Sequence, residues 1–543
     1  MSEIKRVLLV YTDPYYLVKQ VYPFGLDMLA RRLERDGIRT RIEHAFLPGA
    51  DPGANLARAA EEFAPDLIGL GIRNIDTTMA CETYGNFTGP GFRTFFFLPQ
   101  VRAAADAIRR LLPGVPMIAG GGGFSVAPGE MLDYLDIDYG VAGEGEEALA
   151  EFVKAWPDEN ELAGIDGLVM RRGADKKINP RRRFTFDGRT EPARDPGFMH
   201  AFETAGLPVR VKRGCNQACV FCVEPVIEGR RFVHREVDDV VAELRAASEM
   251  EHVNKVFFVD TEFNLPDLEY PRRLVTALID SGLNRRFRFA SQFLPRPFDR
   301  DFAGLLADAG FSVVLTCTSF ADPVLKASGA SYREADIVGA LELCQEYGMD
   351  ATVDLIFGLP GETWETVDYT LAKMREHADS PLRHYEYTVG ARVYPHTPLA
   401  KIVDDNSFEN MYGGCDVGLE PVFYCSPAPP LELKKYIDRR LPAPMRFDNE
   451  ISETARSRLA VGYLSDRGLF SQAYDAYLTL PVREKSEAFD YFFRSLAEAG
   501  HADAARMAAL NLKQAIADSG DPAYAGKSGV IDYYLYLLEQ ARA

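Results

Sequence analysis

The chain has 543 residues, of which 47% are hydrophobic and 26% are charged, and its formal net charge is −19 at pH 7. This length exceeds what one hydrophobic core organises, so we expect two to four domains. The negative charge excludes a general phosphate-binding surface, because nucleic-acid affinity depends on Lys and Arg side chains, and we therefore expect no nucleic-acid partner.

Residues 1–157 alternate strand and helix patterns, which is typical of a doubly wound, Rossmann-like parallel sheet. The N-terminus passes from charged residues directly into "RVLLVYT", which predicts a buried first strand instead of a signal peptide. No apolar run is long enough to span a bilayer, so we expect a cytoplasmic protein. Further strands are predicted at "RTRIEHA", "DLIGLGI" and "VPMIAGGG". Glycines just past the strands place a ligand site at the carboxyl edge of the sheet.

Three further segments follow this first domain. Residues 158–205 are polar and irregular, which predicts a linker or a hairpin. Residues 206–430 contain a second series of about six strands alternating with helices, which favours a full or partial (β/α) barrel whose chemistry lies at the carboxyl ends of its strands. Residues 431–543 lose the strand pattern and resemble paired helices of a repeat array, so we expect an accessory helical domain. The predicted fold class is α/β with a C-terminal α-helical domain.

Three cysteines stand close together in "RGCNQACVFC", which begins where the first strand of the second series ends. Cys215, Cys219 and Cys222 have the spacing C-x3-C-x2-C, and thiolates suit iron–sulfur clusters and zinc. A structural zinc site needs a fourth Cys or His nearby, and none lies between Lys212 and Val233 apart from the three cysteines. A [4Fe-4S] cluster held by three thiolates leaves one iron without a protein ligand. A zinc or electron-transfer site is the alternative.

This pattern, with Phe221 just before the third cysteine, resembles the signature of radical S-adenosylmethionine (SAM) enzymes. In that family the open iron chelates the amino and carboxylate groups of SAM, and an electron from the cluster cleaves the sulfonium to a 5′-deoxyadenosyl radical. The resemblance implies a [4Fe-4S] cluster and SAM as cofactors. It also implies an electron donor such as flavodoxin or ferredoxin.

Other barrel stretches resemble the same family. "FFVDTEFNLP" is similar to the second-strand motif near the SAM amino group, with Asp260, Thr261 and Glu262 as candidates. "VDLIFGLPGETWET", which contains Gly358, is similar to the fifth-strand motif near the adenine. One departure is visible in "LTCTSFADPVL", because Thr318 stands where many relatives carry a carboxylate for the SAM ribose. We therefore expect the ribose to be bound differently here.

The first domain resembles the cobalamin-binding domain that is fused to one large radical SAM class. The resemblance rests on "VYPFGLDMLARRLE", "PDLIGLGIRNID", "VPMIAGGGGFSVAPGEML" and "YGVAGEGEEAL", and on the order of the two modules. Glycines without a side chain let the backbone approach a large planar ligand, and a hydroxyl stands in the same loop. The implied cobalamin-binding residues are Gly120, Gly121, Gly122, Gly123, Ser125, Gly143 and Glu144.

The cobalt ligand is a separate question, because the D-x-H-x-x-G pattern that supplies a histidine is absent. Arg73 and Asn74 follow the third strand, where a side chain would reach the lower cobalt face. A cation there would disfavour coordination and ease release of the methyl group. The alternative pairs Arg73 with Asp76 as a loop brace. "RNID" also resembles the branch that contains the tryptophan 2-C-methyltransferase, whose chemistry is polar methyl transfer to an sp2 carbon.

Two candidate catalytic residues, Tyr394 and His396, stand near the end of the sixth predicted strand. His396 would serve as a base there, whereas the alternative is a purely structural histidine. Together with Arg73 they complete the set of predicted catalytic residues.

The resemblances imply a cobalamin-dependent radical SAM C-methyltransferase. It would transfer a methyl group from SAM, via methylcobalamin, to a carbon of a small-molecule or peptide substrate that the sequence does not specify. The alternatives are a cobalamin-dependent cyclase or ring-rearranging enzyme, polar methyl transfer, and a carrier or sensor that does not turn over SAM. A tRNA methylthiotransferase is excluded, because it would need a second cysteine triad in the first domain, where only Cys81 occurs.

Overall fold

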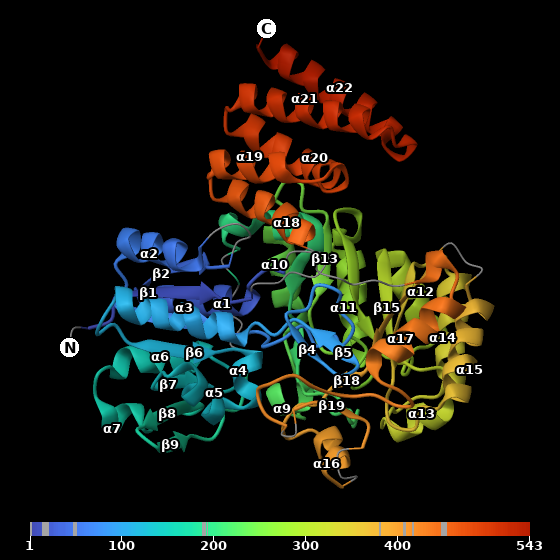
Figure 1. The fold of residues 1–543 in the computed structure, drawn as a ribbon, viewed down its shortest axis with the longest axis horizontal. Coiled ribbons are helices and arrows are strands. Elements are labelled where there is room, and N and C mark those ends of the chain that lie inside the picture. The colour runs from blue at the N-terminus through green and yellow to red at the C-terminus, as the bar shows by residue number, and fades with distance from the viewer. Residues whose placement is uncertain are drawn as a thin grey trace.

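A computed structural model describes residues 3–13, 21–46, 51–186, 192, 194–378, 382–405, 409–414, 417–446 and 453–542. Two α/β parts lie side by side, the first blue to cyan and the second green to yellow, and the red C-terminal helices stand above them (Figure 1). The expected α/β class and the C-terminal helices are confirmed. No helix within these ranges is long and apolar enough to cross a membrane.

The first sheet has seven strands in the order β2-β1-β3-β6-β7-β8-β9, and its first five strands are parallel. The strands are β1 (Arg6–Tyr11), β2 (Arg39–His44), β3 (Leu67–Gly71), β6 (Met117–Gly120), β7 (Tyr139–Val141), β8 (Leu168–Arg172) and β9 (Asp175–Ile178). The strand order reverses at β1, which has β2 on one side and β3 on the other. Such a switch point is where doubly wound sheets bind ligands.

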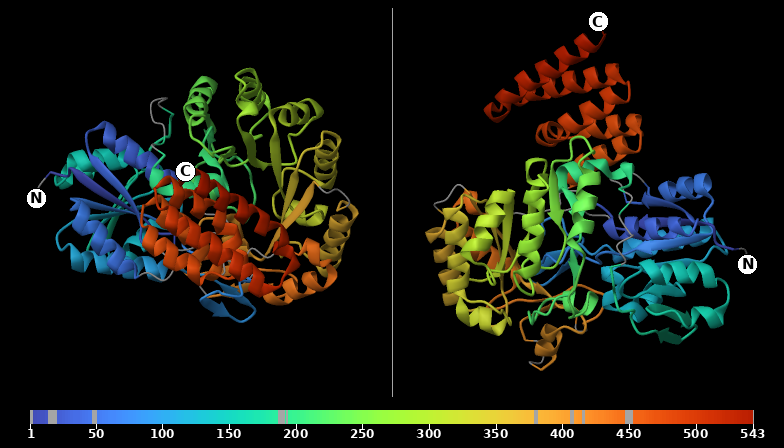
Figure 2. Two further views of the ribbon diagram at one scale, coloured as in Figure 1. Left: turned by 90° about the horizontal axis from the view of Figure 1, so that it is seen from above. Right: turned by 180° about the vertical axis from the view of Figure 1, so that it is seen from behind.

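Helices cover both faces of this sheet, as the alternating pattern predicts (Figure 2). They are α1 (Phe24–Arg35), α2 (Pro52–Phe63), α3 (Leu98–Leu111), α4 (Gly122–Val126), α5 (Pro128–Leu135) and α6 (Glu146–Ala155). Strands β8 and β9 form an antiparallel hairpin in the segment expected to be a linker or hairpin, and they extend the first sheet. A second hairpin, β4 (Phe87–Gly89) and β5 (Phe92–Thr94), reaches the other part, where Gly91 lies against Pro429.

The second sheet has six parallel strands in chain order, β10-β13-β14-β15-β16-β17. Its strands are β10 (Leu207–Val209), β13 (Lys255–Phe258), β14 (Arg288–Phe293), β15 (Phe311–Thr318), β16 (Ala351–Phe357) and β17 (Arg383–Val389). The edge strands β10 and β17 are not paired with each other in the described ranges, so the expected barrel is a partial one.

The helices of the second part lie outside its curved sheet (Figure 2). They are α10 (Val237–Ala247), α11 (Glu269–Asp280), α12 (Arg300–Ala309), α14 (Glu334–Glu346) and α15 (Trp364–Glu376). Alternate residues of β15, β16 and β17 are buried against these helices, among them Leu315, Val353 and Tyr385. Because side chains of a strand alternate between its faces, the residues between them point to the inner face. That inner face carries polar side chains.

The C-terminal helices form a stack of consecutive antiparallel neighbours (Figure 1). They are α18 (Glu453–Asp466), α19 (Phe470–Thr479), α20 (Val482–Glu498), α21 (Ala502–Ser519) and α22 (Ala525–Arg542). Helix α18 anchors the stack on β2, because the Tyr463 hydroxyl donates to Glu43 at 3.1 Å and accepts from the His44 amide at 3.2 Å. The stack also reaches the amino end of a barrel strand, because Glu498 on α20 lies 3.8 Å from His252, which precedes β13.

Candidate active site

The loop that carries the three cysteines runs from β11 (Lys212–Arg213) to α9 (Glu224–Ile227). Backbone hydrogen bonds fix it, from Cys215 N to the Gly229 carbonyl at 3.0 Å and from Val220 N to the Ser328 carbonyl at 2.9 Å. Gly329 has φ +77°, and a Cβ on it would lie 2.3 Å from the Ala218 carbonyl. The fold therefore holds the loop by backbone contacts that are independent of any ligand.

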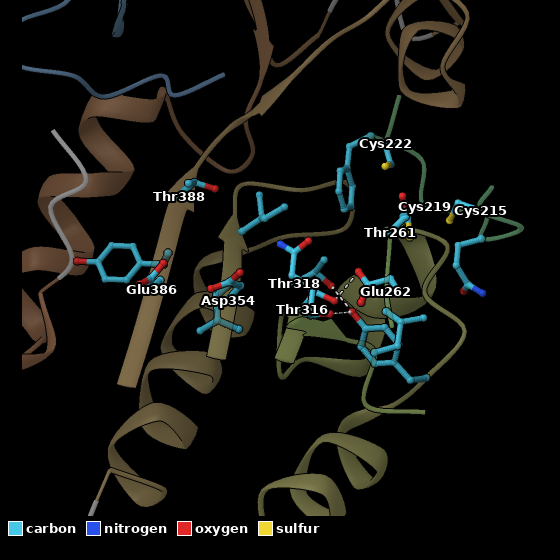
Figure 3. Close-up of a pocket in the computed structure, with 18 of the residues that line it drawn as sticks. Cys215, Cys219, Cys222, Thr261, Glu262, Thr316, Thr318, Asp354, Glu386 and Thr388 are labelled. Atoms are coloured by element: carbon cyan, nitrogen blue, oxygen red, sulfur yellow. Dashed lines mark hydrogen bonds between the residues drawn. The ribbon is translucent and has the colours of Figure 1, made fainter. Parts of the chain in front are cut away.

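The three cysteines line one cavity of about 370 Å³ at the carboxyl ends of the barrel strands (Figure 3). Burial raises the pKa of the Cys219 thiol to about 12 and shifts the pKa values of Cys215 and Cys222 in the same direction. The thiols are therefore protonated in the metal-free protein, and a cluster would displace their protons on binding. The other polar residues with atoms at the cavity are Gln217, Thr261, Glu262, Gln292, Thr316, Thr318, Tyr332, Asp354, Glu386, Tyr387 and Thr388.

The donor set fits a cluster with three protein ligands, since the described residues that line the cavity include three cysteines and no fourth. Among the described residues, no three His, Cys, Asp or Glu side chains are grouped closely enough to hold a single metal ion. Phe221, between the second and third cysteines, also lines the cavity.

Glu262 turns into the cavity from the end of β13 (Figure 3). Its Oε1 accepts a hydrogen bond from the Thr316 hydroxyl at 2.7 Å, whereas its Oε2 is buried and has no hydrogen-bond partner among the described residues. Burial raises the pKa of this carboxyl to about 7. A buried acceptor without a donor calls for a ligand that donates, such as an ammonium group.

Asp260, two residues earlier, is not among the residues that line the cavity. Its carboxylate accepts hydrogen bonds from the backbone amides of Val211, at 2.9 and 3.1 Å, and Lys212, at 2.7 Å. Asp260, which the sequence predicts as a cofactor contact, therefore ties the end of β13 to the start of the cysteine loop in this structure.

Thr318 lines the cavity in an unusual backbone conformation, with φ +54°, at a register shift between β15 and β16. Tyr332 donates its hydroxyl hydrogen to the Thr316 carbonyl at 3.0 Å, so Thr318 is the donor in its 3.1 Å contact with Tyr332. A β-branched residue rarely has positive φ, and such strain concentrates at functional sites. Gly358, at φ +94°, forms the turn after β16 and does not line the cavity.

The predicted glycine loop follows β6 and packs against the loop that follows β3. Gly121 has φ +104°, and a Cβ on it would lie 2.4 Å from the Ile72 carbonyl. The Gly123 amide donates to the Ile72 and Arg73 carbonyls at 3.0 and 2.8 Å. The loop after β3 therefore packs so closely against Gly121 and Gly123 that a side chain would collide with its backbone at Gly121 and would be crowded by it at Gly123. Gly120 and Gly122 have more room. The atom nearest to an added Cβ would lie 3.6 Å away at Gly120 and 3.3 Å away at Gly122.

Ser125 and Gly143 join the loops after β6 and β7. The Ser125 hydroxyl donates to the Gly121 carbonyl at 2.8 Å and accepts from the Gly143 amide at 2.9 Å. Ser125 is also buried, so its hydroxyl acts as a brace between the two loops. The sequence predicted a hydroxyl group in this loop, but it did not predict the hydrogen bond between Ser125 and the Gly143 amide.

Arg73 lies at the switch point of the first sheet and is exposed. It donates two hydrogen bonds to Asp13, which follows β1. The alternative pairing of Arg73 with Asp76 is wrong, because Asp76 accepts a hydrogen bond from Arg392 Nε at 2.7 Å and both residues are buried. That ion pair joins the loop after β3 to the barrel. Asn74, the neighbour of Arg73, packs its backbone against Gly123.

The two candidate catalytic residues after the sixth barrel strand do not line the cysteine cavity. Tyr394 is buried within the core of the first part, where the Arg392 guanidinium lies 4.9 Å from its ring centre. His396 is exposed and lines a second cavity of about 600 Å³ behind the cysteine loop. Cys219 and Cys222 line both cavities, so the loop separates them.

Glu144 links the two parts of the molecule at the cysteine loop. Its carboxylate forms an ion pair with Arg213, directly before the loop, and lies 3.8 Å from Arg210. Arg213 also lies 3.4 Å from Glu228, which accepts a hydrogen bond from the Gly214 amide at 3.2 Å. Burial raises the pKa of Glu144 to about 7. The loop after β7 therefore contacts the segment that positions Cys215.

Sequence reasoning missed three residues of this region, Asp13, Asp354 and Glu386. Asp13 follows the end of β1, as Arg73 follows the end of β3. This position at the carboxyl edge of the sheet could have indicated a site residue. Asp354 interrupts the apolar run of β16, and Glu386 stands between Tyr385 and Tyr387 of β17, so each alternates with residues buried on the other face, a pattern that indicates the inner face of a barrel.

Residues 209–374 match the model of the radical SAM superfamily. Over 454 residues, which are 72% of this chain and 73% of the relative, the chain is 27% identical to the tryptophan 2-C-methyltransferase of Streptomyces laurentii.

Two solved structures share this fold over most of the chain. One is the radical S-adenosylmethionine methyltransferase TsrM from Kitasatospora setae with cobalamin and a [4Fe-4S] cluster bound. It covers 87% of this chain and 99% of its own, with a TM-score of 0.71 and 23% identity. The other is the cobalamin-dependent S-adenosylmethionine radical enzyme OxsB with aqua-cobalamin and S-adenosylmethionine bound. It covers 99% of this chain and 83% of its own, with a TM-score of 0.64 and 14% identity. The predicted arrangement of an N-terminal sheet, a barrel and C-terminal helices is thereby confirmed.

Proposed function

We propose that this radical SAM enzyme is a cobalamin-dependent C-methyltransferase. It would move a methyl group from SAM, by way of methylcobalamin, to a carbon of a small-molecule or peptide substrate. The observation that carries the proposal is the contact between the two predicted cofactor loops, in which Glu144 of the first part pairs with Arg213 beside the cysteine loop. Of the three relatives named above, two are methyltransferases and two were solved with cobalamin, and both properties support the proposal.

On the cluster side, Cys215, Cys219 and Cys222 would hold the [4Fe-4S] cluster. Bound there, the cluster and SAM would supply the methyl donor and, on reduction, a 5′-deoxyadenosyl radical. Glu262 would accept hydrogen bonds from the SAM ammonium group, because its buried Oε2 needs a donor. Thr318 would offer hydroxyl lone pairs to the ribose in place of a carboxylate, which is a weaker interaction than a charge-assisted one.

On the cobalamin side, Arg73, Asn74, Gly120, Gly121, Gly122, Gly123, Ser125 and Gly143 would form the binding loops. Asp13 fixes the Arg73 guanidinium, so that a cation rather than an imidazole would face the cobalt. A fixed positive charge there disfavours a ligand on that face. Tyr394 and His396, the other two residues predicted as catalytic, do not line the cysteine cavity. Any catalytic role of theirs would be exerted from outside this cavity.

Polar methyl transfer without a deoxyadenosyl radical is a second candidate, because Thr318 replaces the expected carboxylate in the cavity. The relative with 27% identity is a tryptophan 2-C-methyltransferase, and the similarity to this branch also supports polar methyl transfer.

The test is anaerobic incubation of cluster-reconstituted, cobalamin-loaded protein with SAM, candidate acceptors and a reductant such as flavodoxin or ferredoxin. Adenosylhomocysteine together with 5′-deoxyadenosine supports radical methylation, and adenosylhomocysteine alone supports polar transfer. 5′-Deoxyadenosine without adenosylhomocysteine indicates a cyclase or ring-rearranging enzyme. A protein that binds both cofactors and turns over no SAM is a carrier or sensor.

A further inference from the structure

Residues 328–332, which lead into α14, contact both the cysteine loop and the end of β15. The Ser331 hydroxyl donates to Gln217 Oε1 in the cysteine loop at 2.6 Å. Tyr332, the last residue of this segment, is buried and lines the cysteine cavity. Its hydroxyl is hydrogen-bonded to two residues of β15. One short segment therefore contacts the loop of the predicted cluster ligands and places a tyrosine hydroxyl at β15.

The two hydrogen bonds of the Tyr332 hydroxyl have a fixed direction. Tyr332 Oη lies 3.0 Å from the Thr316 carbonyl, which can only accept, so the single hydroxyl hydrogen of Tyr332 is donated there. Thr318 Oγ1 lies 3.1 Å from Tyr332 Oη, and it must therefore donate its own hydrogen to the tyrosine. Burial raises the pKa of Tyr332 well above its usual value, so the phenol keeps its hydrogen.

Thr318 therefore faces the cavity as a hydrogen-bond acceptor. Its only hydroxyl hydrogen is engaged by Tyr332, and the lone pairs of Oγ1 are left for a ligand. A ligand group that binds there must donate, as it would to a carboxylate, and a hydroxyl group can do so. Without the Tyr332 hydroxyl, Thr318 would be free to turn its hydrogen toward the ligand. Tyr332 thus determines the direction of this contact.

Thr316 connects the same hydrogen bonds to Glu262. Its carbonyl accepts from Tyr332, and its hydroxyl donates to Glu262 Oε1 at 2.7 Å. Figure 3 shows Thr316, Thr318 and Glu262 close together on the wall of the cavity. The buried Glu262 Oε2 and Thr318 Oγ1 are therefore two acceptors at one place. In SAM, the ammonium group suits the carboxylate, and the ribose carries the hydroxyl donors.

We propose that Tyr332 is a positioning residue for SAM, which engages the hydrogen of Thr318 and so makes the site selective for a ribose that carries its hydroxyl groups. This inference rests on the proposed function, in which Thr318 contacts the ribose. Tyr332 acts through Thr318, which replaces the carboxylate of many relatives by a hydroxyl with only its lone pairs available.

The test measures the binding of adenosylhomocysteine, and of its analogues that lack the 2′ or the 3′ hydroxyl, to the full-length, cluster-reconstituted enzyme by equilibrium dialysis. We expect the wild type to bind adenosylhomocysteine about tenfold more tightly than one of the two analogues, as for the loss of one hydrogen bond to a buried acceptor. In Tyr332→Phe we expect this preference to fall to about twofold, because Thr318 then also donates. The affinity for the deoxy analogue itself stays close to that of the wild type.

Two further variants separate positioning from a general structural role. Thr318→Val removes the acceptor, so we expect it to lose the preference, and Tyr332→Phe added to it to have no further effect on binding. Tyr369→Phe is the matched control. Tyr369 is an exposed residue of α15 whose hydroxyl donates to Glu334 at 2.7 Å, and its variant keeps the wild-type preference.

The outcomes distinguish this inference from the proposed function. It is overturned if Tyr332→Phe keeps the wild-type preference, if it weakens adenosylhomocysteine and both analogues equally, or if it loses iron, since the last two results indicate a merely structural tyrosine. A wild type without any preference for the hydroxyl groups overturns it as well. These results leave the proposed function standing. A wild type that holds no iron or binds no adenosylhomocysteine counts against both.

Discussion

Arg73 donates two hydrogen bonds to one carboxylate oxygen of Asp13, from Nε at 3.1 Å and from Nη2 at 2.8 Å. The two residues follow β1 and β3, which are adjacent strands at the switch point of the first sheet. The pairing fixes the direction of a guanidinium that would otherwise sample many rotamers. Asp13 is therefore a positioning residue for whatever Arg73 faces.

The first prediction concerns the cobalt face that Arg73 would occupy. Arg73→His replaces the guanidinium by an imidazole, a nitrogen ligand for cobalt. In protein loaded with cob(II)alamin, we expect the electron paramagnetic resonance spectrum of the wild type to lack axial nitrogen splitting and that of Arg73→His to show it. Arg109→His, on α3, is the control and keeps the wild-type spectrum. Identical spectra for wild type and Arg73→His would remove Arg73 from the cobalt site.

The second prediction concerns the cluster ligands. Changing Cys215, Cys219 or Cys222 singly to Ala removes one of three thiolates, and we expect each variant to lose most of its iron and its absorbance near 400 nm after anaerobic reconstitution. Cys344→Ala is the control, because Cys344 is a buried free thiol on α14, and this variant retains iron. Iron retention by any of the three ligand variants contradicts the assignment.

The sequence was sufficient for the alternation of strands and helices in the two α/β parts and for the cysteine loop. Alternating apolar residues define β15 and β16, and the loop is local in sequence, so spacing alone identifies it. The alternative that paired Arg73 with Asp76 was wrong, and the sequence did not indicate Asp13, since contacts between different strand ends depend on which strands are neighbours. Likewise Tyr394 follows the sixth strand, but packing against the first part buries it away from the cysteine cavity. Long-range packing of this kind leaves no local pattern in a single sequence.

The third prediction tests whether the backbone contact behind the cysteine loop supports cluster binding. Gly329→Ala places a Cβ 2.3 Å from the Ala218 carbonyl at φ +77°, so the loop must shift. We expect lower iron content and a loss of about 1–3 kcal/mol in the free energy of unfolding.

Gly339→Ala is the matched control for that variant. Gly339 lies inside α14 with nothing within 4 Å of an added Cβ. Alanine there stabilises the helix by about 0.5–1 kcal/mol and leaves the iron content unchanged. If Gly329→Ala binds iron as well as Gly339→Ala does, the contact with Ala218 is not needed for cluster binding.

The last prediction follows from the raised pKa of Asp354, about 7 against an ordinary value of 3.8. Between these two values the folded protein binds more protons than the unfolded chain, so the contribution of Asp354 to stability falls as pH rises from about 4 to about 7. Asp354→Asn does not titrate. We expect this variant of the metal-free protein to exceed the wild type in free energy of unfolding by about 1–3 kcal/mol at pH 8, and by less at pH 5, in urea titrations.

Asp36→Asn is the control for Asp354→Asn, because the pKa of Asp36 is shifted down and the pKa of Asp354 is shifted up. The pKa of Asp36 is lowered by hydrogen bonds from Lys154 and Arg32, so its stabilising effect is complete above about pH 4 and is lost only at lower pH. Its removal therefore costs a similar, small amount at pH 5 and pH 8, because the side chain is near the surface. A stability difference for Asp354→Asn that is equally independent of pH would show that Asp354 is ionised throughout this range. Asp354 would then hold a charge at the cavity that the fold itself compensates.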